Sequence, residues 1–356
     1  MEHFGIDLGG KESQVCVRTP EGTILLERRI RTAALKRWVA GRPPSRVVME
    51  TCTESFSIAD AAIAAGHQVR VVPGLLVKSL GVGARGVKTD KADARVLSEV
   101  SCRIDLPSVH IPSQGARDRK TMCGMRDGLV ECRTKLVNTV RGWVRAEARR
   151  LPSGDIHTLP MRIRETVKTR PAFVDRLLTS IEELTVQIGQ ADQELSSLAK
   201  ADATCQRLMT VPGVGPVTAM RFSATVDDVA RFSSAHQLES YLGLVPGEHS
   251  SGDRKHVTSI TKAGSSQMRW VLVQACWVAR RWFKADPMVR WAQEVEKRKG
   301  KKVAIIALAR KMSGIMYAIW RDGSTYQASR GAARRTAGET DAGLVEATLA
   351  AARARI

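Results

Sequence analysis

The first seventy residues alternate short apolar runs with turn signals, and this order restricts the fold more than any other feature of the chain. Each run has the length and β-branched content typical of a strand or a helix. Strands are expected at residues 3–9, 13–19, 23–31, 45–50 and 67–72. Helices are expected at 33–41 and 54–65. The tripeptide Pro20-Glu21-Gly22 predicts a tight turn between the second and third strands, so three antiparallel strands precede the alternating part.

This order of elements is that of the RNase H-like α/β fold, whose acidic residues gather at the first strand, the fourth strand and a later helix. The present sequence has Asp7 and Glu50 at the ends of the corresponding strands. Asp90 and Asp93 begin a helical pattern over 90–103 and stand at i and i+3, so both can face the same way. The segment 73–86, between the strand 67–72 and the helix 90–103, is glycine-rich and predicts a mobile loop over the site.

Four convergent carboxylates on a basic protein favour a pair of hard cations such as Mg²⁺, because these ions prefer oxygen ligands. Two metal ions about 3.5–4 Å apart can stabilise both the attacking and the leaving oxygen of a phosphodiester. The alternative is a solvated helix start in which Asp90 is simply the N-cap.

The charge of the chain predicts a polyanionic partner. The formal net charge is +20, yet residues 1–100 hold 15 basic and 11 acidic residues, so most of the excess lies further on. The stretch 117–170 has 14 basic and 6 acidic residues. Aromatic residues make up only 4%, so base stacking on an aromatic sheet is not expected to be the main grip.

The cysteines and the apolar runs predict the compartment. The seven cysteines include no CxxC pair, which argues against a zinc ribbon or a disulfide framework and favours a reducing cytoplasm. No signal peptide is recognised at the start, and no uncharged apolar run reaches 18 residues. We therefore expect a cytoplasmic protein with no membrane partner.

Helical periods dominate the rest of the chain. Amphipathic patterns at 114–150 and 172–200 predict two long helices that form a coiled-coil arm. A mostly helical domain follows, with helices expected at 231–242, 265–284 and 302–320. Beyond residue 324 the composition predicts a weakly ordered basic tail. The expected domains are 1–110, 111–203, 204–325 and a tail at 326–356.

Two short motifs in the helical domain suggest contacts with nucleic acid. Gly213 and Gly215, in a Pro-Gly-Val-Gly-Pro run, resemble a helix-hairpin-helix turn, in which backbone N–H groups approach a phosphate; such glycines also occur for packing alone. A later loop contains Ser250 and Ser251. A serine among cations can attack a phosphodiester if its hydroxyl is activated, although a polar turn is the default reading. The neighbouring basic residues are His249, Arg254, Lys255, His256 and Lys262.

Taken together, these motifs resemble those of the DEDD transposases of the insertion-sequence 110 family. The match covers about residues 4–320, and the combination is specific although each motif alone is weak. The matching runs are Gly5-Ile6-Asp7, the strand ending in Glu50, Lys88-Thr89-Asp90-x-x-Asp93-Ala94-Arg95, Pro212-Gly213-Val214-Gly215-Pro216-x-Thr218-Ala219, Gly243-Leu244-x-Pro246-x-x-x-Ser250-Ser251-Gly252, and Ile260-Thr261-Lys262-Ala263-Gly264.

The resemblance implies a domain like the RuvC Holliday-junction resolvase, a coiled-coil arm and a C-terminal transposase domain that holds a serine nucleophile. It implies an RNA-guided recombinase in which a structured non-coding RNA pairs with donor and target DNA. It further implies a dimer that assembles into a tetramer. Carried over by motif, the acidic metal ligands are Asp7, Glu50, Asp90 and Asp93, and the nucleophile is Ser251, with Ser250 as the competitor.

Two departures from the family pattern concern the site. Relatives tend to have Glu-Ala-Thr-Gly at this position, whereas Glu50-Thr51-Cys52-Thr53 lacks the glycine and keeps the carboxylate. Many continue the serine motif with Gly-Lys, where this chain has Asp253 and Arg254, so an acidic group stands beside the nucleophile. The expected nucleic-acid contacts are Lys11, Arg141, Arg145, Arg149, Gly213, Gly215, Arg254, Lys255 and Lys262.

Three functions are compatible with these residues. The first is a recombinase that cleaves and rejoins DNA through Ser251 with Mg²⁺ held by the four acids. The second is a metal-dependent, RuvC-like, structure-specific nuclease that uses water as its nucleophile. The third is a non-catalytic nucleic-acid scaffold in which the acids are helix caps.

Overall fold

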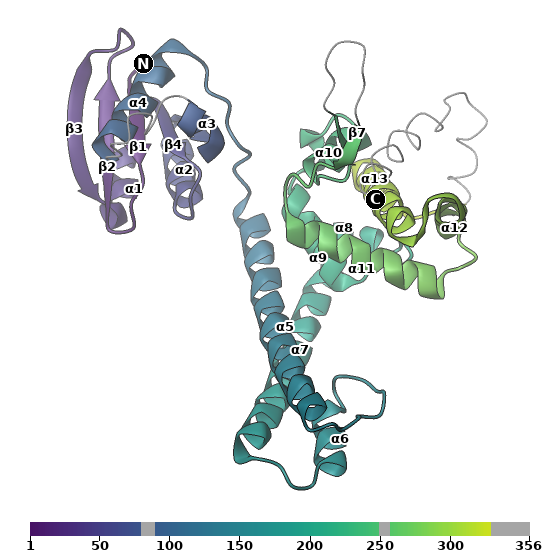
Figure 1. Ribbon diagram of the computed structural model, residues 1–356. Helices are drawn as coiled ribbons and strands as arrows, with labels where there is room; N and C mark the ends of the chain where they lie inside the picture. Colours follow the sequence, from purple (N-terminus) through teal and green to yellow (C-terminus); the bar gives the residue numbers. More distant parts are fainter. Residues whose placement is uncertain (80–89, 249–256, 329–356) are drawn as a thin grey trace. The chain divides into compact units, whose positions relative to one another are not determined.

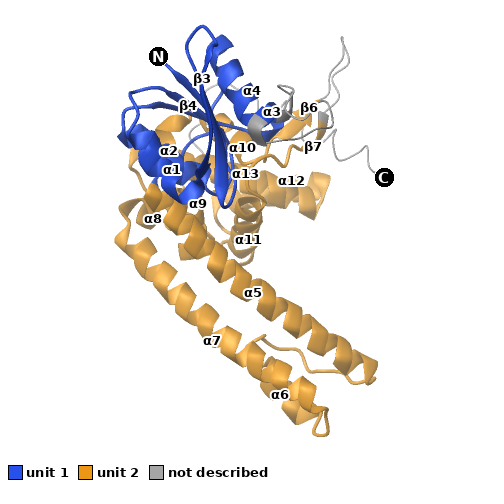
Figure 2. Ribbon diagram, turned by 90° about the vertical axis from the view of Figure 1, so that its left-hand side faces the viewer, with its two compact units in different colours: residues 1–113 blue, residues 114–356 orange. Residues whose placement is uncertain are grey.

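The computed structural model describes residues 1–79, 90–248 and 257–328, which form two compact units, residues 1–113 and residues 114–356 (Figures 1 and 2). Unit 1 contains one five-stranded sheet in the order β3-β2-β1-β4-β5. Its strands are β1 (His3–Asp7), β2 (Glu12–Arg18), β3 (Ile24–Arg31), β4 (Arg46–Glu50) and β5 (Gln68–Val72). Strands β1, β2 and β3 are antiparallel neighbours, whereas β4 pairs parallel to both β1 and β5. This is the expected RNase H-like arrangement.

Helices cover both faces of the sheet, as alternation along the strands requires. Helices α1 (Thr32–Ala40) and α2 (Ser55–Ala64) pack with Val47 and Met49 of β4 on one face. On the other face Val48 packs with Leu97 of α4 (Asp90–Arg103). Both faces of β4 are therefore buried, which explains its continuous apolar run.

The glycine-rich segment after β5 differs from the expectation. Its first part is helical, since α3 spans Gly74–Ser79 with Val77 buried. The prediction of a loop starting at residue 73 was wrong there, because Leu75, Leu76 and Val77 can form a helix once Val77 and Leu76 pack against the sheet. Residues 80–86 of the predicted loop lie outside the described part.

Unit 2 begins with an antiparallel helical hairpin (Figure 1). Its helices are α5 (Gln114–Ala146), α6 (Leu159–Thr166) and α7 (Ala172–Ala201). Val137, Val140 and Val144 of α5 pack against Leu178 and Ile181 of α7. Arg126 bridges the two long helices through a 2.8 Å hydrogen bond to Asp192, which fixes their register. The expected arm is confirmed as a helical hairpin, with the first helix ending four residues earlier than predicted.

The rest of unit 2 is mostly helical. Its helices are α8 (Ala203–Leu208), α9 (Pro216–Val226), the short 3₁₀ helix Val229–Arg231, α10 (Ala235–Tyr241), α11 (Ser266–Trp282), α12 (Pro287–Lys299) and α13 (Lys301–Asp322). Strands β6 (Pro246–Glu248) and β7 (Val257–Ile260) form a small antiparallel pair. Neither α12 nor this pair was predicted. Cys123 and Leu195 of the arm share the core of these helices, so arm and helical domain are continuous.

Helix α13 is the one helix of the described residues whose length and composition would suit a membrane span, and half of its apolar stretch is buried. Leu308, Met312 and Met316 lie in the core of unit 2. Arg310, in the middle of α13, donates a 2.7 Å hydrogen bond to Glu239 of α10. These contacts are those of a core helix in a globular domain.

Candidate active site

Asp7 and Glu50 end neighbouring parallel strands. The ladder between β1 and β4 pairs His3 with Arg46 and continues to Ile6 with Met49, so Asp7 and Glu50 are the next positions along it. Both lie on the sheet face covered by α4, because they follow Gly5 and Val48 by two residues. The carboxyl ends of these strands thus bring two of the four predicted acids to one edge of the sheet.

Helix α4 runs antiparallel to β1, which carries its first turn to the same edge. Near its end, Ser101 Oγ lies 2.8 Å from Nδ1 of His3, at the start of β1. Further back, a Cβ on Gly5 would lie 2.2 Å from the carbonyl oxygen of Ala94, so the helix crosses the strand in close contact there. The helix start, with Asp90 and Asp93, therefore lies toward the end of β1 that carries Asp7.

The tight crossing explains why position 5 is a glycine and how α4 is held. Arg95 forms a bidentate pair with Glu27 of β3, with Nη2 2.7 Å from Oε2. Arg18 of β2 donates a 3.1 Å hydrogen bond to Ser98 Oγ. Polar contacts to two strands and a close backbone approach to a third fix the direction of the helix.

Burial and neighbours differ among the acids. Asp93 is only 5% exposed, so it lies within the protein rather than on a solvated helix start. The Asp90 side chain lies outside the described atoms. Glu50 lies over the first residue of α3: a Cβ on Gly74 would be 2.6 Å from Glu50 Oε1. Gly74 therefore leaves the space that the carboxylate occupies.

The donor set fits a hard divalent cation, because all four candidate ligands are carboxylates and their backbone positions lie toward one sheet edge. Among the described side chains, no three His, Cys, Asp or Glu residues form a group able to hold a metal ion. A complete ligand set would therefore need Asp90, whose side chain is not among the described side chains. Lys11, the predicted basic neighbour, is exposed just after the end of β1.

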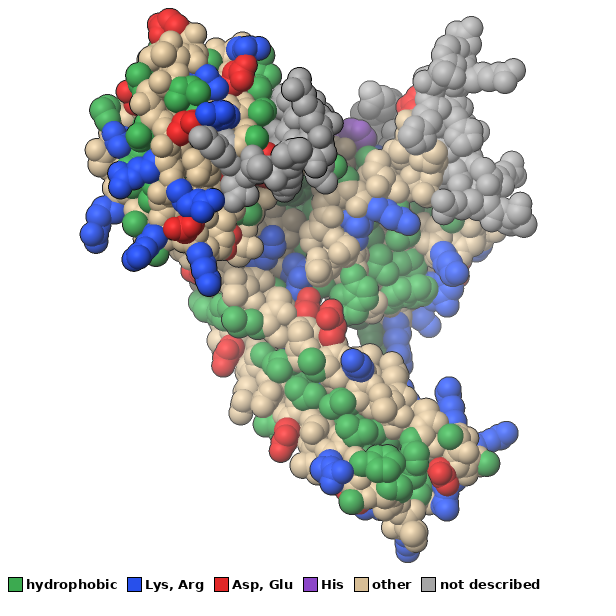
Figure 3. Space-filling model, turned by 60° about the vertical axis from the view of Figure 1, so that its left-hand side comes forward, with side chains coloured by type: hydrophobic (Ala, Val, Ile, Leu, Met, Phe, Trp, Pro, Cys, Tyr) green, Lys and Arg blue, Asp and Glu red, His purple; other side chains and the backbone are tan. Residues whose placement is uncertain are grey.

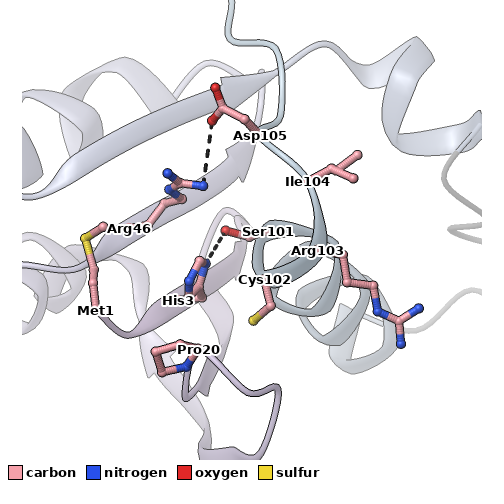
Figure 4. A pocket seen from close by; sticks show the side chains of 9 residues that line it. All are labelled: Met1, His3, Pro20, Arg46, Ser101, Cys102, Arg103, Ile104 and Asp105. Atoms are coloured by element: carbon pink, nitrogen blue, oxygen red, sulfur yellow. Dashed lines mark hydrogen bonds and ion pairs between the residues drawn. The ribbon is translucent and has the colours of Figure 1, made fainter.

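A pocket in unit 1 lies at the opposite end of β1 and is distinct from this edge (Figure 4). His3 and Ser101 line it together with Arg46, which forms a 3.7 Å ion pair with Asp105. Burial, assisted by the charge of Arg46, lowers the pKa of His3. The imidazole is thus biased toward its neutral form, and its hydrogen bond to Ser101 serves to anchor α4.

The serine loop lies outside the described residues, together with Ser250, Ser251, Arg254 and Lys255. What the structure describes is the frame around it. Gly243 has φ +69°, and a Cβ there would lie 2.2 Å from the carbonyl oxygen of Ala263. Lys262 has φ +57° and donates its N–H to the carbonyl of Gly243 at 3.2 Å. The two ends of the β6–β7 hairpin are therefore locked together at its base.

The two glycines of the predicted helix-hairpin-helix turn have different surroundings. Gly213 has φ +86°, and a Cβ there would lie 2.2 Å from the carbonyl oxygen of Ala275 in α11, so packing accounts for this glycine. Gly215 is the N-cap of α9 and has no heavy atom within 4 Å of where a Cβ would be. Of the two, Gly215 keeps an open backbone.

The predicted basic row on the arm is shorter than expected. Arg141 and Arg145 lie on α5, but the helix ends at Ala146, so Arg149 belongs to the following turn. Arg149 there donates a 3.4 Å hydrogen bond to the carbonyl of Thr166. Ala148, with φ +52°, follows the end of the helix, where the N–H of Arg149 donates to the carbonyl of Val144 at 3.1 Å, and no sequence pattern indicated it. The i, i+4 spacing therefore holds for Arg141 and Arg145 only.

Comparison with known proteins identifies the family. Residues 4–146 match a model of the DEDD transposase domain of IS110-type elements, and residues 205–290 match the model described as "Transposase IS116/IS110/IS902 family". The chain belongs to the IS110/IS116/IS902 family of transposases. It is 28% identical over 340 residues to the transposase for insertion sequence element IS1111A of Coxiella burnetii, covering 91% of each chain. It is also 28% identical to a probable family 20 transposase of Pseudomonas aeruginosa, covering 90% of this chain and 96% of that one.

Membership in this transposase family confirms three expectations. The chain is an enzyme that acts on DNA, and the hypothesis of a non-catalytic scaffold was wrong. Its N-terminal domain is of the DEDD type, which implies the use of a divalent metal ion. A transposase also binds DNA, in agreement with the formal charge of +20.

Proposed function

We propose that this transposase cleaves and rejoins DNA through a covalent 5′-phosphoserine formed at Ser251, with the four acids Asp7, Glu50, Asp90 and Asp93 as its metal ligands. The observation that carries the proposal is the meeting of two strand ends and the start of α4 at one sheet edge. The rigid base of the β6–β7 hairpin supports the assignment of Ser251, because a nucleophile must be held in position by a rigid part of the protein.

The chemistry conserves the phosphodiester bond. The Ser251 oxygen replaces the 3′-oxygen at phosphorus, and the serine proton ends on the released 3′-hydroxyl. A 3′-hydroxyl of another strand then attacks the phosphoserine, and the proton returns to Ser251 as the new phosphodiester forms. Divalent ions bound by the carboxylates would stabilise the negative charge that develops at phosphorus, and a set of four carboxylates suits two such ions.

A relative supports exchange of strands over simple cleavage. The chain is 25% identical over 281 residues to the pilin gene-inverting protein of Moraxella bovis, covering 77% of this chain and 79% of that one. Its name describes the inversion of a gene, which requires cut ends to be rejoined. A nuclease that uses water would leave the ends apart.

RNA guidance and assembly complete the proposal. A structured non-coding RNA encoded by the element would lie against the basic arm, where Arg141 and Arg145 are on one helix. We propose that the enzyme works as a dimer that assembles into a tetramer on donor and target DNA.

The cysteines support a cytoplasmic location. The seven free cysteines fit a reducing cytoplasm, and burial raises the pKa of Cys205 to about 11, so this thiol stays neutral and structural.

Ser251→Ala tests the nucleophile directly. The variant should bind DNA as the wild type does and form no covalent adduct on a denaturing gel with labelled DNA, because it lacks only one hydroxyl oxygen. Ser250→Ala is the matched control and should keep at least part of the activity. Peptide mapping of the wild-type adduct should place the phosphate on Ser251. An active enzyme without an adduct, or phosphate on Ser250, would overturn the assignment.

Asp7→Asn tests the carboxylates independently of the serine. Removing one negative charge from the ligand set should abolish adduct formation and recombination while the fold is kept, since Asn preserves the shape of the side chain. The readouts are adduct yield against Mg²⁺ concentration and a thermal unfolding curve. Full activity of Asp7→Asn, or of the wild type in excess chelator, would contradict the metal site.

A further inference from the structure

Helix α11 presents exposed aromatic side chains that the fold of unit 2 does not use. Trp270 is 54% exposed and Trp282 is 70% exposed. The face of α11 opposite Trp270 is anchored in the core by Met268, Leu272 and Ala275, so the helix is firmly held, and Trp282 is its last residue. Large exposed aromatic rings on a rigid helix cost hydration free energy and indicate a binding surface.

Cations border these rings. Lys301 Nζ lies 5.1 Å from the ring centroid of Trp277, a partly buried ring that packs against the core two helical turns from Trp270 and on the same face. The Arg281 guanidinium lies 5.0 Å from the ring centroid of Trp282. Such contacts hold the charges beside the aromatic surface. Figure 3 shows hydrophobic side chains gathered on the globular part of unit 2 with Lys and Arg beside them.

A basic corner continues the surface where α12 meets α13. Five of six consecutive residues there are cationic: Lys297, Arg298, Lys299, Lys301 and Lys302. Among the ion pairs of the described residues, only Lys297 of this group has a carboxylate partner, Glu294 at 2.8 Å. The corner is therefore a concentrated positive charge that suits a polyanion.

We propose that the α11 surface (Trp270, Trp277, Arg281 and Trp282) and the adjoining basic corner bind an unpaired DNA strand. Tryptophan rings offer stacking platforms to any base, and lysines along the edge neutralise phosphates. Bases in a duplex are already stacked on each other, so exposed rings favour an unpaired strand. DNA is the substrate class of a transposase, and this proposal assigns the surface to an unpaired strand of that substrate. A second copy of the chain fits less well, since it would bring the same positive charge.

The α11 surface also begins beside the base of the β6–β7 hairpin. Arg269, next to Trp270, donates hydrogen bonds to the carbonyls of Leu242 at 3.2 Å and Gly264 at 3.3 Å. These carbonyls belong to the segments that enclose the β6–β7 hairpin. A strand held along α11 would thus be attached to the same rigid frame. The inference rests on action on DNA and does not require Ser251 to be the nucleophile.

The test measures binding of a fluorescent oligothymidylate, an oligouridylate and a DNA duplex of equal length to the full chain. All proteins carry Ser251→Ala, so that cleavage does not interfere. Trp270→Ala and Trp282→Ala should each weaken oligothymidylate binding about ten-fold, the usual effect of removing one stacking platform, with little change for the duplex. Trp270→Phe should retain most of the affinity. Leu25→Ala, 52% exposed on β3 of unit 1, is the control and should bind normally.

Four outcomes would overturn the proposal: unchanged oligothymidylate binding, an equal decrease for duplex and single strand, a decrease for oligouridylate alone, or dissociation of the protein assembly with strand binding intact. The last would assign the surface to a second copy. Thermal unfolding of each variant shows that the fold is kept. Lys301→Ala should reduce the salt dependence of oligothymidylate binding, which a purely apolar contact would not do.

Discussion

At the residue scale, small side chains decide where the acidic side chains of unit 1 can lie. Gly5 allows α4 to cross β1 in contact with its backbone, and Gly74 leaves room for the Glu50 carboxylate. Neither glycine has a positive φ, so space rather than backbone conformation explains them. Within the segment 51–53 that departs from the family pattern, burial raises the pKa of the Cys52 thiol, so this thiol remains neutral.

Gly74→Ala should lower activity without unfolding the protein. The added Cβ would lie 2.6 Å from Glu50 Oε1, so the flexible carboxylate must move by about 1 Å, a displacement that typically costs up to about 100-fold in rate. Gly41→Ala is the control, because its Cβ would meet only ordinary contacts, at 3.5 Å from the Arg37 carbonyl oxygen. Strand cleavage as a function of Mg²⁺ concentration provides the measurement. Wild-type metal dependence in Gly74→Ala would show that Glu50 is not a ligand.

At the element scale, a buried ion pair joins the arm to the helical domain. Arg221 of α9 donates hydrogen bonds to Asp127 at 2.6 Å and to the carbonyl of Cys123 at 3.0 Å, both on α5. Its side chain is only 8% exposed. Because α5 also packs on α7, this contact fixes the arm against the domain that carries the serine loop.

Arg221→Ala should destabilise unit 2 by about 3 kcal/mol, since it leaves the Asp127 carboxylate largely buried and without this partner. The free energy of unfolding from urea titration provides the measurement. Arg321→Ala is the control, because the pair between Arg321 and Asp322 is exposed and should contribute nothing measurable. Equal stability of the two variants would mean that the ion pair between Arg221 and Asp127 does not stabilise the contact between the arm and the helical domain.

At the scale of the whole molecule, charge governs affinity more than any single contact. The net charge of +20 is concentrated after residue 100, in unit 2. Neutralising phosphates releases counterions, so binding should fall steeply with salt. The same field attracts DNA and RNA alike, and discrimination between them must come from local surfaces.

Charge reversal of Arg141 and Arg145 should weaken RNA binding more than duplex DNA binding if the arm holds the guide RNA. The slope of log affinity against log salt should also become shallower, by roughly 0.7–0.9 for each phosphate that is no longer neutralised. Reversal of both Arg28 and Arg29 to Glu, two residues exposed on β3 in unit 1, controls for the change in net charge. The measurement is titration at several salt concentrations. An equal decrease in affinity for both nucleic acids would remove the arm from the RNA-binding surface.

The sequence by itself determined the strands of the sheet and the two long helices of the arm, and it indicated the candidate metal ligands. The sheet strands, the arm helices and the four acids follow from periodicity, turn residues and residue type, which act over a few positions. Only the tertiary structure decided the direction of α4 over Gly5, the packing of Gly213 on α11, the helical start of the segment after β5 and the exposure of Trp270 and Trp282. Each of these depends on contacts between residues far apart in the chain. Local pattern carries no information about such contacts, because their free energy exists only once the core has formed.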